Sequence, residues 1–208
     1  MTNLWQKIIG GNSDYTEYTS IQNLAQHAPD IPAPKPHGLV KFSSASIIFM
    51  TYFPSRTLEQ AWAKLTHENK VLVQHQLNGI FSRLRMLKNE GGHRLSGVRW
   101  EGVKDDHREP YRSDKVIMIT AELEDFQFSV PLHGSRSWIN FLRSLLPVAE
   151  EGSVFTHGEV RRANIMVKLN DCNNYVVTSI IDWETSGFYP DYYESSKLFV
   201  HLQHAHRN

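Results

Sequence analysis

Two short segments in the last third of the chain, residues 155–167 and 180–184, restrict the possible folds more than any other feature. In the first, Phe-Thr-His-Gly-Glu-Val-Arg-Arg-Ala-Asn-Ile-Met-Val, the carboxylate of Glu159 is followed five residues later by the amide of Asn164. The second, Ile-Ile-Asp-Trp-Glu, is a short apolar run that leads to Asp182. An acid on a turn can accept a proton, and an amide with a second carboxylate can hold magnesium against phosphate groups. We therefore expect Glu159, Asn164 and Asp182 to converge in one cleft.

The composition is typical of a soluble globular protein, with 40% hydrophobic and 21% charged residues. Lysine plus arginine and aspartate plus glutamate both total 22, so the formal net charge is zero. A neutral chain gives no electrostatic reason to expect nucleic acid or an anionic membrane as a partner. Cys172 is the only cysteine, which excludes an intramolecular disulfide and a cysteine-rich zinc site.

The start of the chain, Met1 to Lys7, lacks the pattern of a cleavable signal peptide. No apolar run approaches the ~20 residues that a membrane-spanning helix needs. Together with the single cysteine, these features predict a cytoplasmic protein.

The N-terminal quarter predicts two strands and one helix. Leu4 to Ile9 is short and apolar, and a Gly-Gly-Asn-Ser turn follows it. A helix with one apolar stripe is expected from Asp14 to near Pro29. The prolines in residues 31–36 require an extended chain, because each proline disfavours helix in the residue before it. Ser46 to Phe53 is predicted to be a buried strand.

Thr66 to Lys88 has the strongest helical pattern in the sequence. Thr66 is suited to cap the N-terminus, and the negative charge of Glu68 is favourable in the first turn. Apolar residues recur at the helical period and predict a helix at the centre of a lobe, with a buried face formed by Val73, Leu77, Ile80, Phe81, Leu84 and Leu87.

Long loops are expected between residues 89 and 136, where only Val116 to Thr120 resembles a strand. Trp138 to Leu146 is predicted to be a short helix. Strands are expected around the two constraining segments, at residues 154–155, 165–169 and 175–181. The last two are separated by Asn-Asp-Cys-Asn-Asn, which predicts a hairpin.

The motifs, taken in their order along the chain, resemble those of the aminoglycoside phosphotransferase and choline kinase-like family, whose fold is that of protein kinases. The resemblance covers nearly the whole chain, and the two constraining segments at their spacing are its most specific part. The other matching features are Glu17, the Ile-Pro-Ala-Pro run at 31–34 before His37 and Gly38, the strand at 46–53, the helix at 66–88, and Gly187 to Pro190 leading to Tyr193 and Glu194.

The resemblance implies an α+β, protein kinase-like fold with two lobes. Residues 1–53 would form a truncated N-lobe with a small antiparallel sheet, and residues 54–208 would form a mainly helical C-lobe. The lobes would make one compact unit, with residues 50–53 as the hinge between them.

The resemblance also implies ATP and magnesium as cofactors and a small molecule as substrate. Lys7 on the first strand would neutralise the nucleotide phosphates, with Glu17 holding it in position. Asn164 and Asp182 would be the magnesium ligands. The alternative interpretation of Lys7 and Glu17 is that they are ordinary surface charges.

Glu159 occupies the place of the general base, where the family has aspartate, and its extra methylene moves the carboxylate by about 1.5 Å. Glutamate can still accept a proton, because its intrinsic pKa is close to that of aspartate. Arg161 matches a position where protein kinases place a lysine near the transferred phosphoryl group, so it is a catalytic candidate beside Glu159 and Asp182. It could act in this way or bind an anionic substrate group bidentately. The adjacent Arg161 and Arg162 are also compatible with a solvent-facing pair.

Two further features depart from the family pattern. Only six residues precede Lys7, too few for the glycine-rich loop that would cover the phosphates. The chain also stops at Asn208, before most of the later C-lobe helices. Weak, metal-dependent nucleotide binding is therefore expected.

Four interpretations of function remain open. The first is a small-molecule phosphotransferase that uses ATP and magnesium. The second is a kinase-derived fold with different chemistry, such as cyclisation or rearrangement of a metabolite, in which Glu159, Asp182 and Arg161 act without any cofactor. The third is a non-catalytic pseudokinase that binds a ligand or partner, and the fourth is a shortened gene product that still folds.

Other residues have simpler interpretations. The ring of His157 is expected to bond to backbone groups around its loop. Three aromatic residues are expected to pack in the core: Trp183, Tyr192 and Tyr193. The end of the chain fits either a metal site on a helix or a solvated tail, because it contains His201, His204 and His206.

Overall fold

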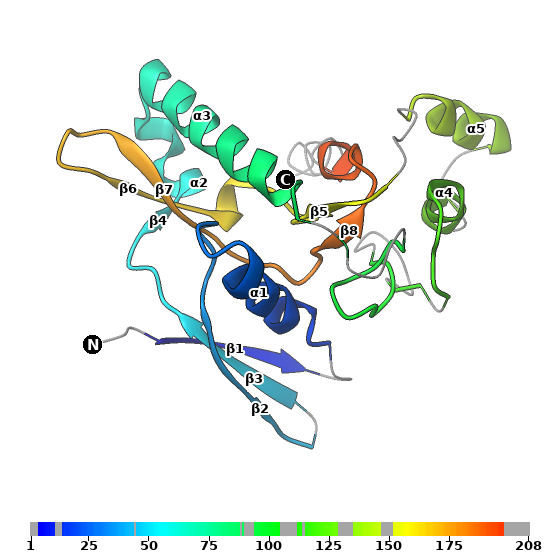
Figure 1. Cartoon of the computed structure of the whole chain (residues 1–208). Coiled ribbons are helices and arrows are strands. Elements are labelled where there is room, and N and C mark those ends of the chain that lie inside the picture. Colours follow the sequence, from blue (N-terminus) through cyan, green and yellow to red (C-terminus); the bar gives the residue numbers. More distant parts are fainter. Residues whose placement is uncertain are drawn as a thin grey trace.

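The computed structural model describes residues 4–10, 14–43, 45–87, 89, 94–104, 112–113, 115–128, 135–146 and 152–197. Along the chain the elements are β1 (Leu4–Gly10), α1 (Thr16–His27), β2 (Pro36–Lys41), β3 (Ala45–Thr51), β4 (Arg56–Thr57), α2 (Leu58–Ala61), the 3-10 turn η1 (Trp62–Lys64), α3 (His67–Leu84), α4 (Thr120–Phe128), α5 (Arg136–Ser144), β5 (Val154–Thr156), the 3-10 turn η2 (Arg162–Asn164), β6 (Ile165–Leu169), β7 (Tyr175–Ile180) and β8 (Gly187–Tyr189). Within these described residues the strands form small antiparallel sheets in the orders β1–β3–β2, β4–β6–β7 and β5–β8 (Figure 1). This mixture of helices and small antiparallel sheets confirms the expected α+β class.

The N-terminal sheet contains both strands that the sequence predicts there and one that it does not. β1 and β2 pair with opposite edges of β3, and Lys7 of β1 lies opposite Ile48. The sequence does not predict β2, which begins at Pro36 after a proline-rich run. Proline lacks the N–H that a ladder needs, but an edge strand such as β2 tolerates it. The predicted helix is also present and begins at Thr16.

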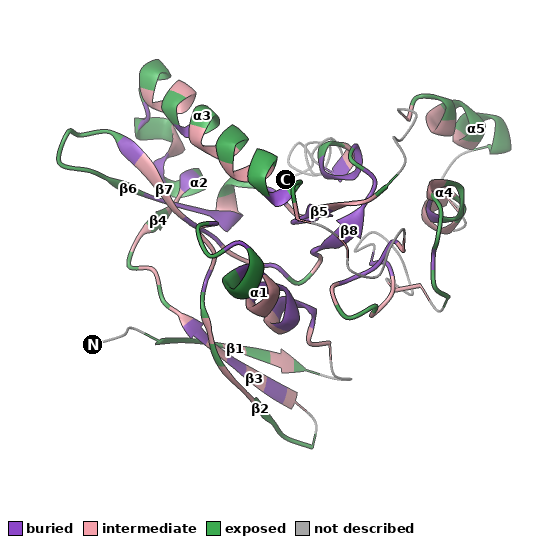
Figure 2. Ribbon diagram, viewed as in Figure 1, coloured by how far each residue is buried: buried purple, intermediate pink, exposed green. Residues whose placement is uncertain are grey.

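The second sheet contains the predicted hairpin of β6 and β7, and α3 packs against β7. As predicted, Thr66 caps α3, because its Oγ1 accepts a hydrogen bond from the Asn69 N–H at 3.2 Å. α3 ends at Leu84, earlier than the predicted Lys88. Val73 and Leu84 are buried, whereas much of the outer surface of α3 is exposed (Figure 2). The predicted apolar face is therefore confirmed, because Leu77, Ile80, Phe81 and Leu87 also pack, partly buried, against the hydrophobic clusters, and α3 covers one side of the hairpin.

In its described residues, the region between residues 89 and 136 has more secondary structure than predicted. It contains α4, whose apolar residues lack a helical period and leave Leu123 as its buried residue. The strand-like run from Val116 to Thr120 is not a strand. Only Ile117 within it bridges to Leu95, and Thr120 already belongs to α4. None of the described helices has the length and apolar character required to cross a bilayer.

The main hydrophobic cluster connects the N-terminal sheet with the two constraining segments. Its buried members come from both sides of residue 53, and they are Ile21, Leu24, Ala28, Ile31, Ile48, Met50, Leu84, Phe155, Ile180, Trp183 and Phe188. The indole N–H of Trp183 donates to the carbonyl oxygen of Ile180 at 2.8 Å, which satisfies its polar atom in the core. Tyr192 and Tyr193 are also buried, so the packing role predicted for these aromatics is confirmed. The division into lobes at 1–53 and 54–208 stays a prediction.

Candidate functional site

The turn after β5 presents Glu159, and its shape requires a glycine. Gly158 has a φ of +84°, and a Cβ there would lie 2.5 Å from the carbonyl oxygen of Thr185. The buried imidazole of His157 accepts a hydrogen bond from the Glu159 N–H at 3.2 Å and donates to the carbonyl oxygen of Ile181 at 2.9 Å. Burial lowers the pKa of His157 to about 4, so the ring is neutral at pH 7. The predicted structural role of His157 is confirmed.

Asn164 connects this turn to the end of β7. Its side-chain amide donates to the carbonyl oxygen of Glu159 at 3.0 Å and approaches the carboxylate Oε2 of the same residue at 3.4 Å. The backbone carbonyl oxygen of Asn164 accepts a hydrogen bond from the N–H of Ile181, the residue before Asp182, at 2.9 Å. Among the described residues no group donates to Asn164 Oδ1, so this oxygen of a largely buried side chain is available to a ligand.

Asp182 follows β7 in a left-handed backbone conformation, with a φ of 70°. For a residue other than glycine this conformation is strained, and such strain concentrates at functional sites. The half-exposed Arg161 lies between the two carboxylates, with its Nε 3.4 Å from Glu159 Oε1 and its Nη2 3.8 Å from Asp182 Oδ2. The geometry thus places Glu159, Asn164 and Asp182 together with Arg161 at the rim, as the sequence predicts. The chemical roles of these residues stay predictions.

Lys7 is held by three carboxylates from distant parts of the chain. Its Nζ lies 2.7 Å from Glu17 Oε2, 2.6 Å from Asp182 Oδ1 and 2.8 Å from Glu184 Oε2. Burial alone would lower the pKa of Lys7, but the charge of Glu17 and hydrogen bonds to the three carboxylates raise it well above its ordinary value. Burial raises the pKa of Glu17 against the opposing attraction of Lys7. The predicted Lys7–Glu17 pair is therefore present, and the interpretation of both as ordinary surface charges is wrong.

The sequence does not single out Glu184 for this cluster, although it lies two residues after Asp182 in the second constraining segment. Carboxylate oxygens of Glu17, Asp182 and Glu184 lie within 4.8 Å of one another. Magnesium prefers oxygen ligands, so this donor set fits the metal. The ammonium of Lys7 lies among the same oxygens and balances part of their charge. Outside the described residues lie the C-terminal histidines that also fit a metal site by sequence, His201, His204 and His206.

A second buried cation holds the backbone of Glu184. Lys104, which is 2% exposed, donates to the Glu184 carbonyl oxygen at 2.6 Å and lies 2.5 Å from Asp14 Oδ2. The hydroxyl of Tyr193 donates to the carbonyl oxygen of Lys104 at 2.9 Å. Burial opposes ionisation of Asp14, but the ammonium of Lys104 outweighs it and holds the pKa of that carboxyl well below its usual range. The sequence gives no signal for this role, because Lys104 lies in the region predicted to be loops.

Glu194 supports the turn that carries Glu159. Its buried carboxylate accepts hydrogen bonds from the backbone N–H groups of His157 at 2.6 Å and of Gly158 at 3.1 Å. Burial raises the pKa of Glu194 to about 7, although the two hydrogen bonds favour the ionised form. Glu194 belongs to the motif series that the sequence shares with the family, but only the fold assigns it this positioning role.

Replacing Glu194 by Gln should change how stability depends on pH. The folded-state pKa of about 7 exceeds the ordinary value of 4.5, so the stability contributed by Glu194 is fully present below pH 4.5 and is lost as the pH rises through 7. The loss corresponds to about 3 kcal/mol across this window. Glutamine does not titrate, so the unfolding free energy of Glu194→Gln relative to the wild type should rise between about pH 5 and pH 8.

Urea unfolding of both proteins across this range measures the effect. The titration of His157, whose pKa is about 4, is common to both proteins and cancels in the comparison. If the unfolding free energies of the wild type and Glu194→Gln changed equally with pH, Glu194 would not titrate in the fold.

Comparisons with known proteins bear on the family. The model of a family described as "Phosphotransferase enzyme family" matches residues 16–206. A search of curated proteins by sequence found no match. The similarity is therefore to a family model and to solved structures.

Solved structures with a similar fold include aminoglycoside phosphotransferases. A thermostable mutant of aminoglycoside phosphotransferase APH(4)-Ia in its apo form has a TM-score of 0.59 and 12% identity, covering 95% of this chain and 65% of that chain. A ternary complex of such a mutant with ADP and hygromycin B has a TM-score of 0.58 and 13% identity, covering 95% and 64%. For aminoglycoside-3'-phosphotransferase of type VIII the TM-score is 0.53 and the identity 18%, covering 94% and 66%. The chain thus spans 64–66% of the length of these structures, and the likeness confirms the predicted kinase-like fold.

Proposed function

Because the chain belongs to the phosphotransferase enzyme family, we propose that it transfers the γ-phosphoryl group of ATP to a hydroxyl group of a small molecule. The observation that carries this proposal is the single connected site formed by Glu159, Arg161, Asn164, Asp182 and Lys7. One carboxylate of this site can accept a proton, while its amide, second carboxylate and ammonium can hold a metal and phosphate groups.

In this proposal Glu159 is the general base. Its carboxylate is 12% exposed and contacts both the Asn164 amide and the Arg161 guanidinium, and these contacts orient it. An oriented carboxylate at the edge of an open site can accept the proton of an incoming hydroxyl group. Arg161 is half-exposed, so its remaining N–H groups can meet the transferred phosphoryl group or an anionic group of the substrate.

Asn164 and Asp182 are the proposed magnesium ligands, with Glu184 as a further oxygen donor. Bound magnesium would neutralise charge on the phosphate groups. Lys7 would contribute a second positive charge to the nucleotide phosphates, and its contact with the buried Glu17 keeps the ammonium at the site. This arrangement supports ATP and magnesium as cofactors.

Turnover of ATP with a panel of hydroxyl-bearing small molecules, beginning with aminoglycosides, tests the proposal. ADP formation that requires both magnesium and an acceptor is the expected result. Mass spectrometry of the product then identifies the phosphorylated acceptor. If magnesium and ATP bind but no acceptor raises ADP formation above the rate without it, the proposed phosphoryl transfer is wrong.

We further propose that Trp5 and Tyr52 hold the nucleotide base. Their rings stack with centroids 5.8 Å apart and are 53% and 40% exposed. Trp5 lies two residues before Lys7 on β1, so both side chains point to the same face of the sheet. An exposed aromatic ring beside a cation suits a planar base that carries phosphate groups.

Trp5→Ala should weaken the binding of ATP with magnesium by about tenfold, because stacking of a base on an aromatic ring contributes about 1–3 kcal/mol. Isothermal titration calorimetry measures the affinity. Trp138→Ala is the matched control, because Trp138 is 50% exposed and also stacks on a neighbour, Phe141, at 5.4 Å. Equal nucleotide affinities for the wild type and Trp5→Ala would remove this aromatic pair from the proposed site.

A second candidate function is ligand binding without phosphoryl transfer. The Lys7 cluster favours it, because an ammonium lies among the carboxylates of Asp182 and Glu184 that would otherwise meet a metal. A thermal-shift titration with ATP and magnesium, together with the turnover panel, separates the two functions. If the nucleotide at 100 times its Kd stabilises the fold by about 2.7 kcal/mol and no acceptor leads to ADP, binding alone is favoured.

A further inference from the structure

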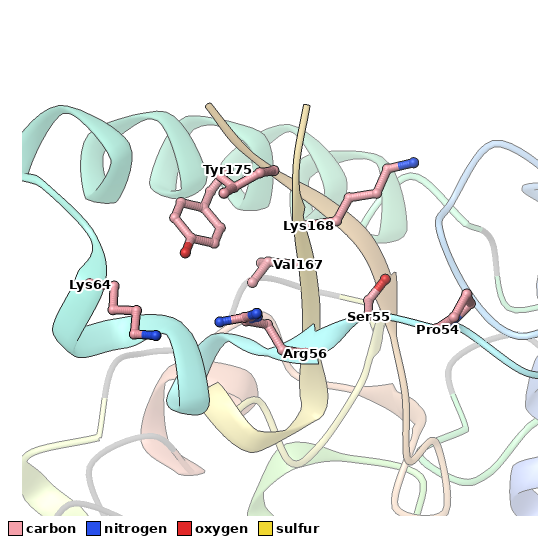
Figure 3. Close-up of a pocket in the computed structure, with 8 residues that line it drawn as sticks. Pro54, Ser55, Arg56, Lys64, Val167, Lys168 and Tyr175 are labelled. Atoms are coloured by element: carbon pink, nitrogen blue, oxygen red, sulfur yellow. The ribbon is translucent and has the colours of Figure 1, made fainter. Parts of the chain in front are cut away.

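A pocket of about 610 Å³ lies on the sheet of β4, β6 and β7 (Figure 3). β6 begins at Ile165, next to Asn164 of the candidate active site, and runs toward Lys168 and Leu169, which line the pocket. At about 3.3 Å per residue, Lys168 lies about 13 Å along the strand from Asn164. The pocket is therefore a separate site.

The lining of this pocket carries positive charge without a matching negative charge. Arg56, Lys64 and Lys168 line it, and no aspartate or glutamate in the described part of the chain does. Among the described residues none of these three cations makes an ion pair or a hydrogen bond. Because the formal charge of the whole chain is zero, this concentration of positive charge is local to the pocket.

The same pocket has an apolar floor. Val167 is fully buried and Tyr175 is 6% exposed, and both belong to the hydrophobic cluster under α2 and α3. Figure 3 shows the Tyr175 hydroxyl on the same side of β6 as the ends of Arg56 and Lys64, whereas the amine of Lys168 lies on the other side. A ligand in this pocket would therefore meet an aromatic ring and an aliphatic surface beside two cations and a hydroxyl group.

We propose that this pocket binds a small organic anion with an apolar body and a phosphate or carboxylate group. Arg56 and Lys64 hold the anionic group, because a guanidinium donates two parallel hydrogen bonds to such a group and an ammonium adds a compact charge. The partly accessible ring of Tyr175 and the exposed Leu169 contact the apolar body, above the buried Val167.

The pocket is also connected to the loop that carries Glu159. Lys64 ends the 3-10 turn η1, which begins at Trp62. The guanidinium of Arg162, three residues after Glu159, lies over the Trp62 ring at 4.9 Å.

Calorimetric titration of the full chain with 1-naphthyl phosphate tests this proposal, with 1-naphthol and inorganic phosphate as probes of each half of the ligand. Binding of 1-naphthyl phosphate tighter than either of these is expected. The double variant Arg56→Gln/Lys64→Gln should weaken it by about tenfold or more, because hydrogen bonds to charged groups are lost. Lys115→Gln/Arg136→Gln is the control, because it removes the same charge outside the pocket.

Unchanged melting temperatures of both double variants establish that the fold is intact. Three outcomes overturn the proposal: no binding of 1-naphthyl phosphate at millimolar concentration, an equal loss of affinity in both double variants, or an affinity in Arg56→Gln/Lys64→Gln that matches the wild type. The last outcome would place the bound anion elsewhere, such as at Lys7. The test does not involve ATP turnover, so it stands or falls independently of the proposed phosphoryl transfer.

Discussion

Glu159→Gln is expected to lower the rate of phosphoryl transfer by about 100- to 10,000-fold, the contribution typical of a general base. Glutamine keeps the size of the side chain and can still bond to Asn164, but it cannot accept the proton of the acceptor hydroxyl. The measured quantity is kcat with the acceptor found in the turnover panel. Affinity for ATP with magnesium should stay nearly unchanged, because Glu159 is not among the proposed nucleotide contacts.

Glu159→Asp is the matched control for this prediction. It keeps the carboxylate and withdraws it by about 1.5 Å. Its contacts with Arg161 and Asn164, both at 3.4 Å, would lengthen, so the rate should fall, but by less than in Glu159→Gln. A Glu159→Gln protein that works at the wild-type rate would show that another group accepts the proton.

Lys7→Met is expected to lower the free energy of unfolding by about 3 kcal/mol, the low end for breaking a buried ion pair. The low end applies because the Lys7 side chain is 30% exposed, whereas Glu17 is 3% exposed. Methionine fills similar space without the charge, so the buried Glu17 carboxylate loses its partner. Asp182 and Glu184 would also face each other without the shared cation. Guanidinium chloride unfolding of the wild type and variant measures the difference.

The double variant Lys7→Met/Glu17→Gln should recover much of this stability, because a neutral amide at position 17 needs no cation. Lys35→Met is the control for an exposed lysine and should change stability by less than about 0.5 kcal/mol. If the single and double variants were equally unstable, repulsion between Asp182 and Glu184 rather than the burial of Glu17 would explain the loss.

The sequence alone indicates the parts of the fold that depend on short-range interactions. Glu159 and Asn164 are five residues apart, and a hydrogen bond within one turn joins them. The cap of α3 at Thr66 and the β6–β7 hairpin are similarly local. Elements without a local pattern were beyond prediction. α4 has no amphipathic period, and β2 follows prolines that argue against a strand.

Except for the Lys7–Glu17 pair, which the family resemblance implies, only the tertiary structure decided how the buried charges pair. Lys7 meets Asp182 across 175 residues of sequence, and Lys104 meets the carbonyl of Glu184 across 80. The chain has 22 acidic residues, and nothing in the local sequence selects which of them a given lysine will contact. A buried charge needs a partner wherever the fold supplies one, because desolvation is costly. The sequence therefore determined the candidate catalytic residues and their family, whereas packing decided that Glu184, Lys104 and Glu194 hold them in place.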